Sequence, residues 1–122
     1  MFFYDSYAVL AYLSGHPLYQ PYFEENDGFL TKLNLLEVYY RTLEVHGEEA
    51  ASKVLKAFSK YAVEFGATDV EGSMKLRLKL KKGGSNLSYA DALGYYLAIK
   101  ADVKFLTGDK EFSKLESVEF VL

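Results

Sequence analysis

The chain has 122 residues, no cysteine, and a formal net charge of −3 at pH 7. The lack of cysteine excludes disulfides, thiolate catalysis and sulfur-ligated zinc or iron, so any metal ion must use oxygen or imidazole ligands. The negative charge argues against binding nucleic acid through bulk positive charge, because Lys and Arg supply most of the affinity for phosphates. We expect one domain over residues 1–122. With no secretion leader and no run near the roughly 20 apolar residues of a membrane span, we also expect a soluble, cytoplasmic protein.

The first quarter of the chain predicts a strand, a helix, short helical turns and a second strand. Residues 2–4 form a short apolar run, and Ser6 can cap a helix that continues to residue 13. Two prolines favour one or two short helical turns over residues 17–25. After a turn, residues 29–31 predict the second strand.

Two consecutive helices are predicted next, over residues 34–46 and 48–61. In the first of them, Leu36, Tyr40 and Leu43 recur at helical spacing. We therefore expect these three side chains to form the buried face of that helix.

The following segment is ambiguous. A third strand is predicted over residues 63–65, and between Met74 and Leu80 apolar residues alternate strictly with Lys and Arg. Strict alternation is the strand period, so the local pattern favours a strand there.

The last third of the chain alternates between helices and strands. After a glycine-rich loop we predict a helix over residues 88–101, a strand over 103–107, a short helix over 109–115 and a final strand over 118–121. Strands that alternate with helices indicate an α/β fold with a mainly parallel sheet.

Four acidic residues lie where a strand ends or a helix begins, and these are Asp5, Glu37, Asp91 and Asp109. The carboxyl ends of parallel strands share one rim, so acids far apart in sequence can meet there. Each acid also has a structural explanation as a helix cap, which stabilises by roughly 0.3–1 kcal/mol. Glu37 fits a capping box with Asn34, and Asp91 fits one with Ser88.

The joint pattern favours a metal site over four separate caps. Two like charges about 4 Å apart repel by roughly 4 kcal/mol at an effective dielectric constant of 20, which is several times the contribution of a cap. Such a cluster needs a cation or bound protons. Oxygen ligands favour Mg²⁺ or Mn²⁺, which can polarise a phosphoryl oxygen and generate hydroxide. The pattern therefore predicts a metal-dependent phosphodiesterase.

Two other families with acids at strand ends fit poorly. A haloacid-dehalogenase-type phosphatase needs a second Asp two places after Asp5, where Tyr7 stands. A phospho-receiver domain needs an acidic pair after its first strand and a phosphorylatable Asp after its third, where Ser6 and Gly66 stand.

Four motifs together resemble the PIN domain family, and most closely its small VapC-type ribonuclease toxins. They are the segments 4–6, 35–38, 87–93 and 105–112, in that order along the chain. The resemblance implies a three-layer α/β/α fold with a mainly parallel sheet. It also makes residues 70–82 helical, and we adopt that prediction over the local strand period.

The resemblance further implies an endoribonuclease whose acidic pocket binds one or two Mg²⁺ or Mn²⁺ ions. The residues implied in metal binding and catalysis are Asp5, Glu37, Asp91 and Asp109. Ser6 and Thr107 would form hydrogen bonds to the metal ligands or to water without contacting the metal ion. Asn34 would do the same unless it serves only as a helix cap. His16 and His46 are expected to lie away from this pocket.

The implied partners are an RNA substrate, a second copy of the chain in a homodimer, and an antitoxin protein bound in a groove near the acids. If residues 75–82 are helical, Lys75, Lys79 and Lys82 share one face and could guide RNA to the pocket. Two alternatives stay open. One is a catalytically silent PIN-like module that binds RNA or protein, and the other is an RNA-processing nuclease outside a toxin–antitoxin pair.

Overall fold

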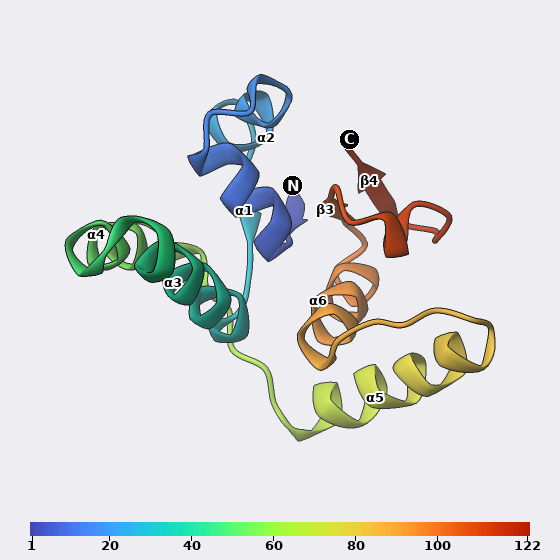
Figure 1. Ribbon diagram of the computed structural model, residues 1–122. Coiled ribbons are helices and arrows are strands. Elements are labelled where there is room, and N and C mark those ends of the chain that lie inside the picture. Colours follow the sequence, from blue (N-terminus) through green and yellow to red (C-terminus); the bar gives the residue numbers. More distant parts are fainter.

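The structure is a computed structural model that describes all residues from 1 to 122 (Figure 1). Its sheet consists of β1 (Phe2–Tyr4), β2 (Gly28–Phe29), β3 (Lys104–Thr107) and β4 (Val118–Phe120). The α-helices are α1 (Ser6–Leu13), α2 (Gln20–Glu24), α3 (Lys32–His46), α4 (Glu48–Phe58), α5 (Ala67–Lys82) and α6 (Tyr89–Lys100). Three 3₁₀ turns complete the chain, and they are η1 (Pro17–Tyr19), η2 (Ser59–Tyr61) and η3 (Lys110–Phe112).

All strand pairs are parallel, and the strand order is β2-β1-β3-β4. The chain passes from β1 to β2 on one side and later returns to β3 on the other side of β1. The order therefore reverses between β1 and β3, and α/β sheets of this kind bind ligands at such a switch point. Since Tyr4 pairs with Leu106, Asp5 and Thr107 follow this pair at the same end of the sheet.

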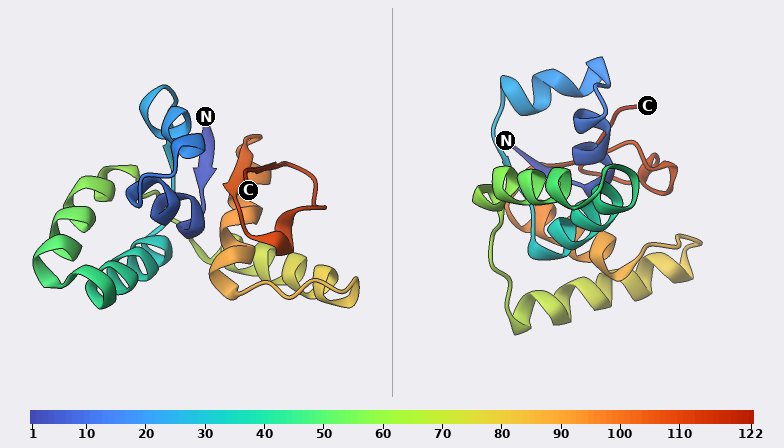
Figure 2. Two further views of the ribbon diagram at one scale, coloured as in Figure 1. Left: turned by 45° about the horizontal axis from the view of Figure 1, so that its top comes forward. Right: turned by 60° about the vertical axis from the view of Figure 1, so that its left-hand side comes forward.

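Helices cover the sheet on both faces, as the three-layer prediction required. Phe3 and Phe105 stack at 5.5 Å beneath α6, while Tyr4 points to the other face and stacks on Phe23 at 4.2 Å. The α3–α4 and α5–α6 pairs lie on opposite sides of the molecule (Figures 1 and 2). No helix has the length and the apolar character needed to cross a membrane.

The predicted strand over residues 63–65 is wrong. Only Ala62 pairs in this segment, through a single parallel bridge to Leu30. Two hydrogen bonds make the bridge, from the Leu30 amide to the Tyr61 carbonyl at 3.0 Å and from the Val63 amide to the Leu30 carbonyl at 2.8 Å. The pairing stops because Thr31 already serves as the cap of α3 and turns the chain away from the sheet. The short helix predicted over residues 109–115 is only the 3₁₀ turn η3, and the other predicted elements are confirmed with small shifts at their ends.

Residues 74–80 are helical, so the family resemblance was right and the local strand period was wrong. At the start of helix α5 the Gly66 amide donates a hydrogen bond to the Asp69 carboxylate at 3.0 Å. Its Leu76 and Leu80 lie four residues apart and pack against the core, while Leu78 is left exposed. The alternation of apolar and basic residues over 74–80 is therefore compatible with a helix in which Leu76 and Leu80 face the core and Leu78 faces solvent.

The buried face predicted for α3 is also wrong. Leu36 and Tyr40 are 66% and 61% exposed, and Leu43 is exposed as well, whereas Leu35 and Val38 are buried. The helix carries apolar residues on two faces, and the sequence pattern alone selected the outer one.

Asn34 fixes the rotation of α3. Its side-chain carbonyl accepts hydrogen bonds from the Thr31 amide at 3.0 Å and from the Thr31 hydroxyl at 3.1 Å, and its amide donates to Ser6 Oγ at 3.0 Å. Asn34 is 2% exposed, so its turn of the helix must face inward. Val38 lies four residues later on that face. The cap of α3 is thus Thr31 with Asn34, and the capping box predicted between Asn34 and Glu37 does not form.

Gly94 of α6 packs directly on the sheet, and we predict that Gly94→Ala destabilises the protein. A Cβ at this position would meet ring atoms of Phe3 at 2.6 Å and of Phe105 at 3.1 Å. Overpacking of this kind costs about 1–3 kcal/mol, more than the roughly 1 kcal/mol of helix propensity that alanine adds. Urea unfolding measures the change, and Gly83→Ala, whose Cβ has only ordinary contacts, is the control. Equal stability of the two variants would contradict this packing.

Candidate functional site

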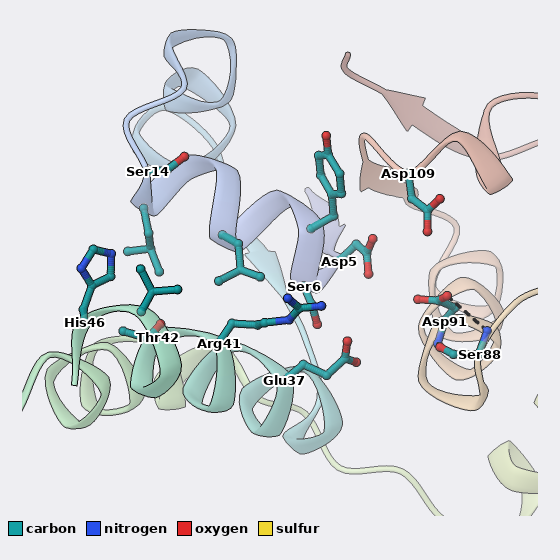
Figure 3. Close-up of a pocket in the computed structure, with 14 residues that line it drawn as sticks. Asp5, Ser6, Ser14, Glu37, Arg41, Thr42, His46, Ser88, Asp91 and Asp109 are labelled. Atoms are coloured by element: carbon teal, nitrogen blue, oxygen red, sulfur yellow. Dashed lines mark hydrogen bonds between the residues drawn. The ribbon is translucent and has the colours of Figure 1, made fainter. Parts of the chain in front are cut away.

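The four predicted acids line one cavity of about 650 Å³ at the switch point of the sheet (Figure 3). Asp5 follows β1, Glu37 lies in α3, Asp91 lies in the first turn of α6, and Asp109 follows β3. This volume is within the range of small-molecule sites, so the cavity has room for more than a single ion.

Asp5 is the deepest of the four acids, with 4% of its surface exposed. It occupies the cap position of α1, but its side chain makes no capping hydrogen bond. Instead, one carboxylate oxygen accepts a 2.6 Å hydrogen bond from the Thr107 hydroxyl. The structural explanation of Asp5 as a helix cap is therefore wrong, and its carboxylate faces the cavity.

Thr107 connects Asp5 with Asp109. The fully buried Thr107 hydroxyl donates to Asp5 and accepts a 3.0 Å hydrogen bond from the Asp109 amide. One Asp109 carboxylate oxygen accepts from the Glu111 amide at 3.0 Å, so Asp109 does cap η3. Its side chain lies at the cavity wall opposite Glu37 (Figure 3).

Asp91 and Glu37 differ in their structural roles. Asp91 forms the predicted capping box, in which its carboxylate accepts from the Ser88 amide at 3.2 Å and its own amide donates to Ser88 Oγ at 3.0 Å. Glu37 lies beyond the first turn of α3 and takes no part in its cap. Capping thus accounts for Asp91 and Asp109 but not for Asp5 and Glu37.

The acids raise the pKa values of one another within the cavity. Burial raises the pKa of Asp5 to about 7, and the charges of Asp91 and Glu37 add to the rise against the opposing hydrogen bond from Thr107. Partial burial and the charge of Asp91 raise the pKa of Glu37. Burial also raises the pKa of Asp91, against its hydrogen bonds from Ser88. Such shifts are typical of sites that bind a cation.

The donor set of this cavity fits a hard divalent cation. The candidate ligands at the acidic end are all carboxylate oxygens. The one histidine that lines the cavity, His46, lies at the other end. No three acidic or histidine side chains are close enough together to form a closed coordination group. Mg²⁺ commonly keeps several waters and binds one or two carboxylates directly, so an open arrangement of acids suits it.

The remaining predicted residues divide into two groups. Ser6 lines the cavity, and Asn34 supports Ser6 from behind while it also caps α3. None of the three lysines predicted to guide RNA lines the cavity, since Lys75, Lys79 and Lys82 belong to α5.

The cavity also contains residues that the sequence analysis did not assign. His46 lines its far end, so the expectation that it lies away from the pocket is wrong. Arg41 and Thr42 follow Glu37 by four and five residues and line the same wall. Helical spacing from Glu37 could have identified Arg41, because residues four apart share a face.

Comparison with known proteins agrees with this architecture. The family model described as PIN domain matches residues 2–118. The chain is similar to a toxin–antitoxin complex from Klebsiella pneumoniae, with a TM-score of 0.77, 19% identity, and coverage of 98% of this chain and 96% of that chain. It is equally similar to VapBC2 from Rickettsia felis bound to a promoter DNA fragment, with a TM-score of 0.77, 18% identity and the same coverage. No curated protein matches the chain.

The raised pKa of Asp5 predicts that Asp5→Asn stabilises the metal-free protein at alkaline pH. The pKa rises from 3.8 to about 7 on folding, so the folded protein holds this proton more tightly than the unfolded chain does. The stability gained is complete below pH 3.8 and is lost as the pH rises through about 7. Between pH 5 and pH 8 the wild type should lose a few kcal/mol more than Asp5→Asn, since one pKa unit is about 1.4 kcal/mol.

Urea unfolding in the presence of a chelator at both pH values tests this prediction. Asp102→Asn is a matched control, because Asp102 is exposed and its positive φ of 55° suits Asn equally well. A pH dependence that is the same in the wild type and Asp5→Asn would show that Asp5 is not buried as a titrating acid.

Proposed function

Because the chain belongs to the PIN domain family, we propose that its acidic cavity is the active site of a Mg²⁺- or Mn²⁺-dependent endoribonuclease. One observation carries the proposal. A buried carboxylate without a capping role, Asp5, shares a cavity with three further acids from separate parts of the chain. Such a cluster costs free energy in the folded protein unless a cation compensates its charge. The proposed unit of activity is the single domain of residues 1–122.

The ligands proposed for the metal ion are Asp5, Glu37, Asp91 and Asp109. A bound divalent ion polarises a phosphoryl oxygen and lowers the pKa of a coordinated water. The protein orients the carboxylates. Thr107 leaves one oxygen of Asp5 free while it holds the other, and Ser88 does the same for Asp91. Ser6, held by Asn34, offers a hydroxyl at the cavity floor.

We further propose that the protein is the toxin of a toxin–antitoxin pair and acts on RNA in the cytoplasm. The support is that one of the two similar structures is a toxin–antitoxin complex, and the other is VapBC2 bound to a promoter DNA fragment. The exposed apolar residues of α3 suit a protein partner, since a contiguous apolar surface indicates an interaction site. A second cavity of about 550 Å³ lies on this surface, and it is lined by Lys32, Leu35, Leu36, Tyr39, Leu55 and Ser59. A helical segment of an antitoxin is the proposed occupant, and a homodimer the proposed oligomer.

The first test is cleavage of an unstructured RNA oligonucleotide with Mn²⁺ or Mg²⁺. We expect the wild type to cut the RNA, and Asp5→Asn and Asp91→Asn to lose at least about a hundredfold in rate, since each removes a proposed metal ligand. Both variants should remain folded, as circular dichroism can check.

Asp102→Asn, which changes an exposed acid outside the cavity, should cleave like the wild type. If the wild type binds RNA or protein but never cleaves, the catalytically silent module is the correct description. Cleavage that survives equally in Asp5→Asn and Asp91→Asn would assign the activity to another site.

The second test concerns the protein partner. The product of a small reading frame directly upstream, co-expressed with the chain, should co-purify with the wild type and not with Leu36→Glu, because a charge on this 66% exposed apolar residue opposes docking. The control is Leu78→Glu, which changes a 55% exposed leucine on α5. Equal co-purification of both variants would place the partner elsewhere, and an upstream product that never binds would favour an RNA-processing role.

A further inference from the structure

The cavity has an acidic end and a second end between two helices. The four acids occupy one end. At the other end Leu10 and Leu13 of α1, with Ser14 directly after it, face Thr42, Val45 and His46 of α3. Arg41 stands between the two ends, with its guanidinium directed toward Ser6 and the acids (Figure 3). An RNA strand that is cut at the acidic end and continues between α1 and α3 must therefore pass Arg41.

Arg41 is the only lysine or arginine that lines this cavity. It forms none of the four ion pairs of the protein and none of its side-chain hydrogen bonds, so all of its donors are free. Its one interaction with the acids is through charge, because it lowers the pKa of Glu37 against the larger effect of burial. A guanidinium with unused donors in a cavity is a typical receptor for a phosphate, which it can bind through two parallel hydrogen bonds.

Charge balance shows why a second cation is useful beside the acids. Metal ions bound at the acidic end would offset the charge of the carboxylates and of the phosphate being cleaved. The neighbouring phosphate of an RNA chain still brings a full negative charge into a protein whose net charge is already −3. A positive group at the entrance to this end offsets that repulsion, and the lysines of α5 cannot, because they do not line the cavity.

We propose that Arg41 binds the RNA phosphate adjacent to the one that is cleaved. The role of Arg41 rests on the proposed ribonuclease function, and it makes the residue a determinant of substrate binding that acts outside the metal ligands. The competing role is structural, with Arg41 serving only as a counter-charge for Glu37 one helical turn away. The two roles differ in what they predict for RNA and for metal binding.

The experiment compares Arg41→Gln and Arg41→Lys with the wild type in cleavage of a single-stranded RNA whose cut site has been mapped. Arg41→Gln should raise KM about tenfold, as expected for the loss of a charge-assisted hydrogen bond, and Arg41→Lys should lose less. Binding of the same RNA to Asp91→Asn should have a salt slope that falls by about 0.7 when Arg41→Gln is added. Mn²⁺ affinity, measured by calorimetry, should stay unchanged. Lys53→Gln, in an exposed ion pair on α4, is the charge-matched control.

An uncharged methylphosphonate placed on either side of the cut site identifies the phosphate. At one of the two positions it should raise KM for the wild type and for Lys53→Gln, and add nothing in Arg41→Gln. Equal losses in all three proteins, or an Arg41→Gln variant with altered Mn²⁺ affinity and unchanged KM, would overturn the proposal and leave the counter-charge role. A wild type that neither cleaves nor binds the RNA would refute the ribonuclease function, and the role of Arg41 with it.

Discussion

The hydrogen bond between Thr107 and Asp5 is the constraint on which the site depends. Parallel pairing of β1 with β3 brings these residues together from opposite ends of the chain, and the 2.6 Å bond holds a carboxylate that is almost fully buried. The same threonine accepts the Asp109 amide and so fixes the turn that follows β3. One hydroxyl group thereby couples the strand order of the sheet to the position of two of the four acids.

Several groups serve the fold and the cavity together. Asp91 caps α6 and Asp109 caps η3, while each also lines the cavity. Asn34 caps α3 and holds Ser6, which places Glu37 on the cavity wall one turn further along the helix. The acids themselves reduce the stability of the fold. The pKa values of Asp5, Glu37 and Asp91 are raised, so bringing these carboxylates together opposes folding at neutral pH. Caps and the buried asparagine offset part of that cost.

Asp5 and Asp109 could be predicted to lie together because they follow the parallel strands β1 and β3, whose carboxyl ends share one rim. The rotation of α3 could not be predicted from the sequence. The inward face of this helix is selected by the contact between Asn34 and Ser6, which are 28 residues apart. The strand pattern of residues 74–80 misled for a related reason, because packing against α6 decides between two periods that the sequence satisfies equally. The place of Arg41 in the cavity was not predicted, because an arginine four residues after a glutamate is typical of an ion pair on the surface of a helix.

The close packing of Gly94 on the two stacked phenylalanines has a consequence for evolution of the proposed active site. Asp91 lies three residues before Gly94 on the same rigid helix, so the depth to which α6 sinks onto the sheet also sets how far Asp91 stands from Asp5. Swapping Phe3 or Phe105 for a residue of another size would therefore shift a carboxylate without touching any wall of the cavity. Substitutions in the hydrophobic interior can therefore change the distances between the acids, and related sequences that keep all four acids need not keep the same spacing between them.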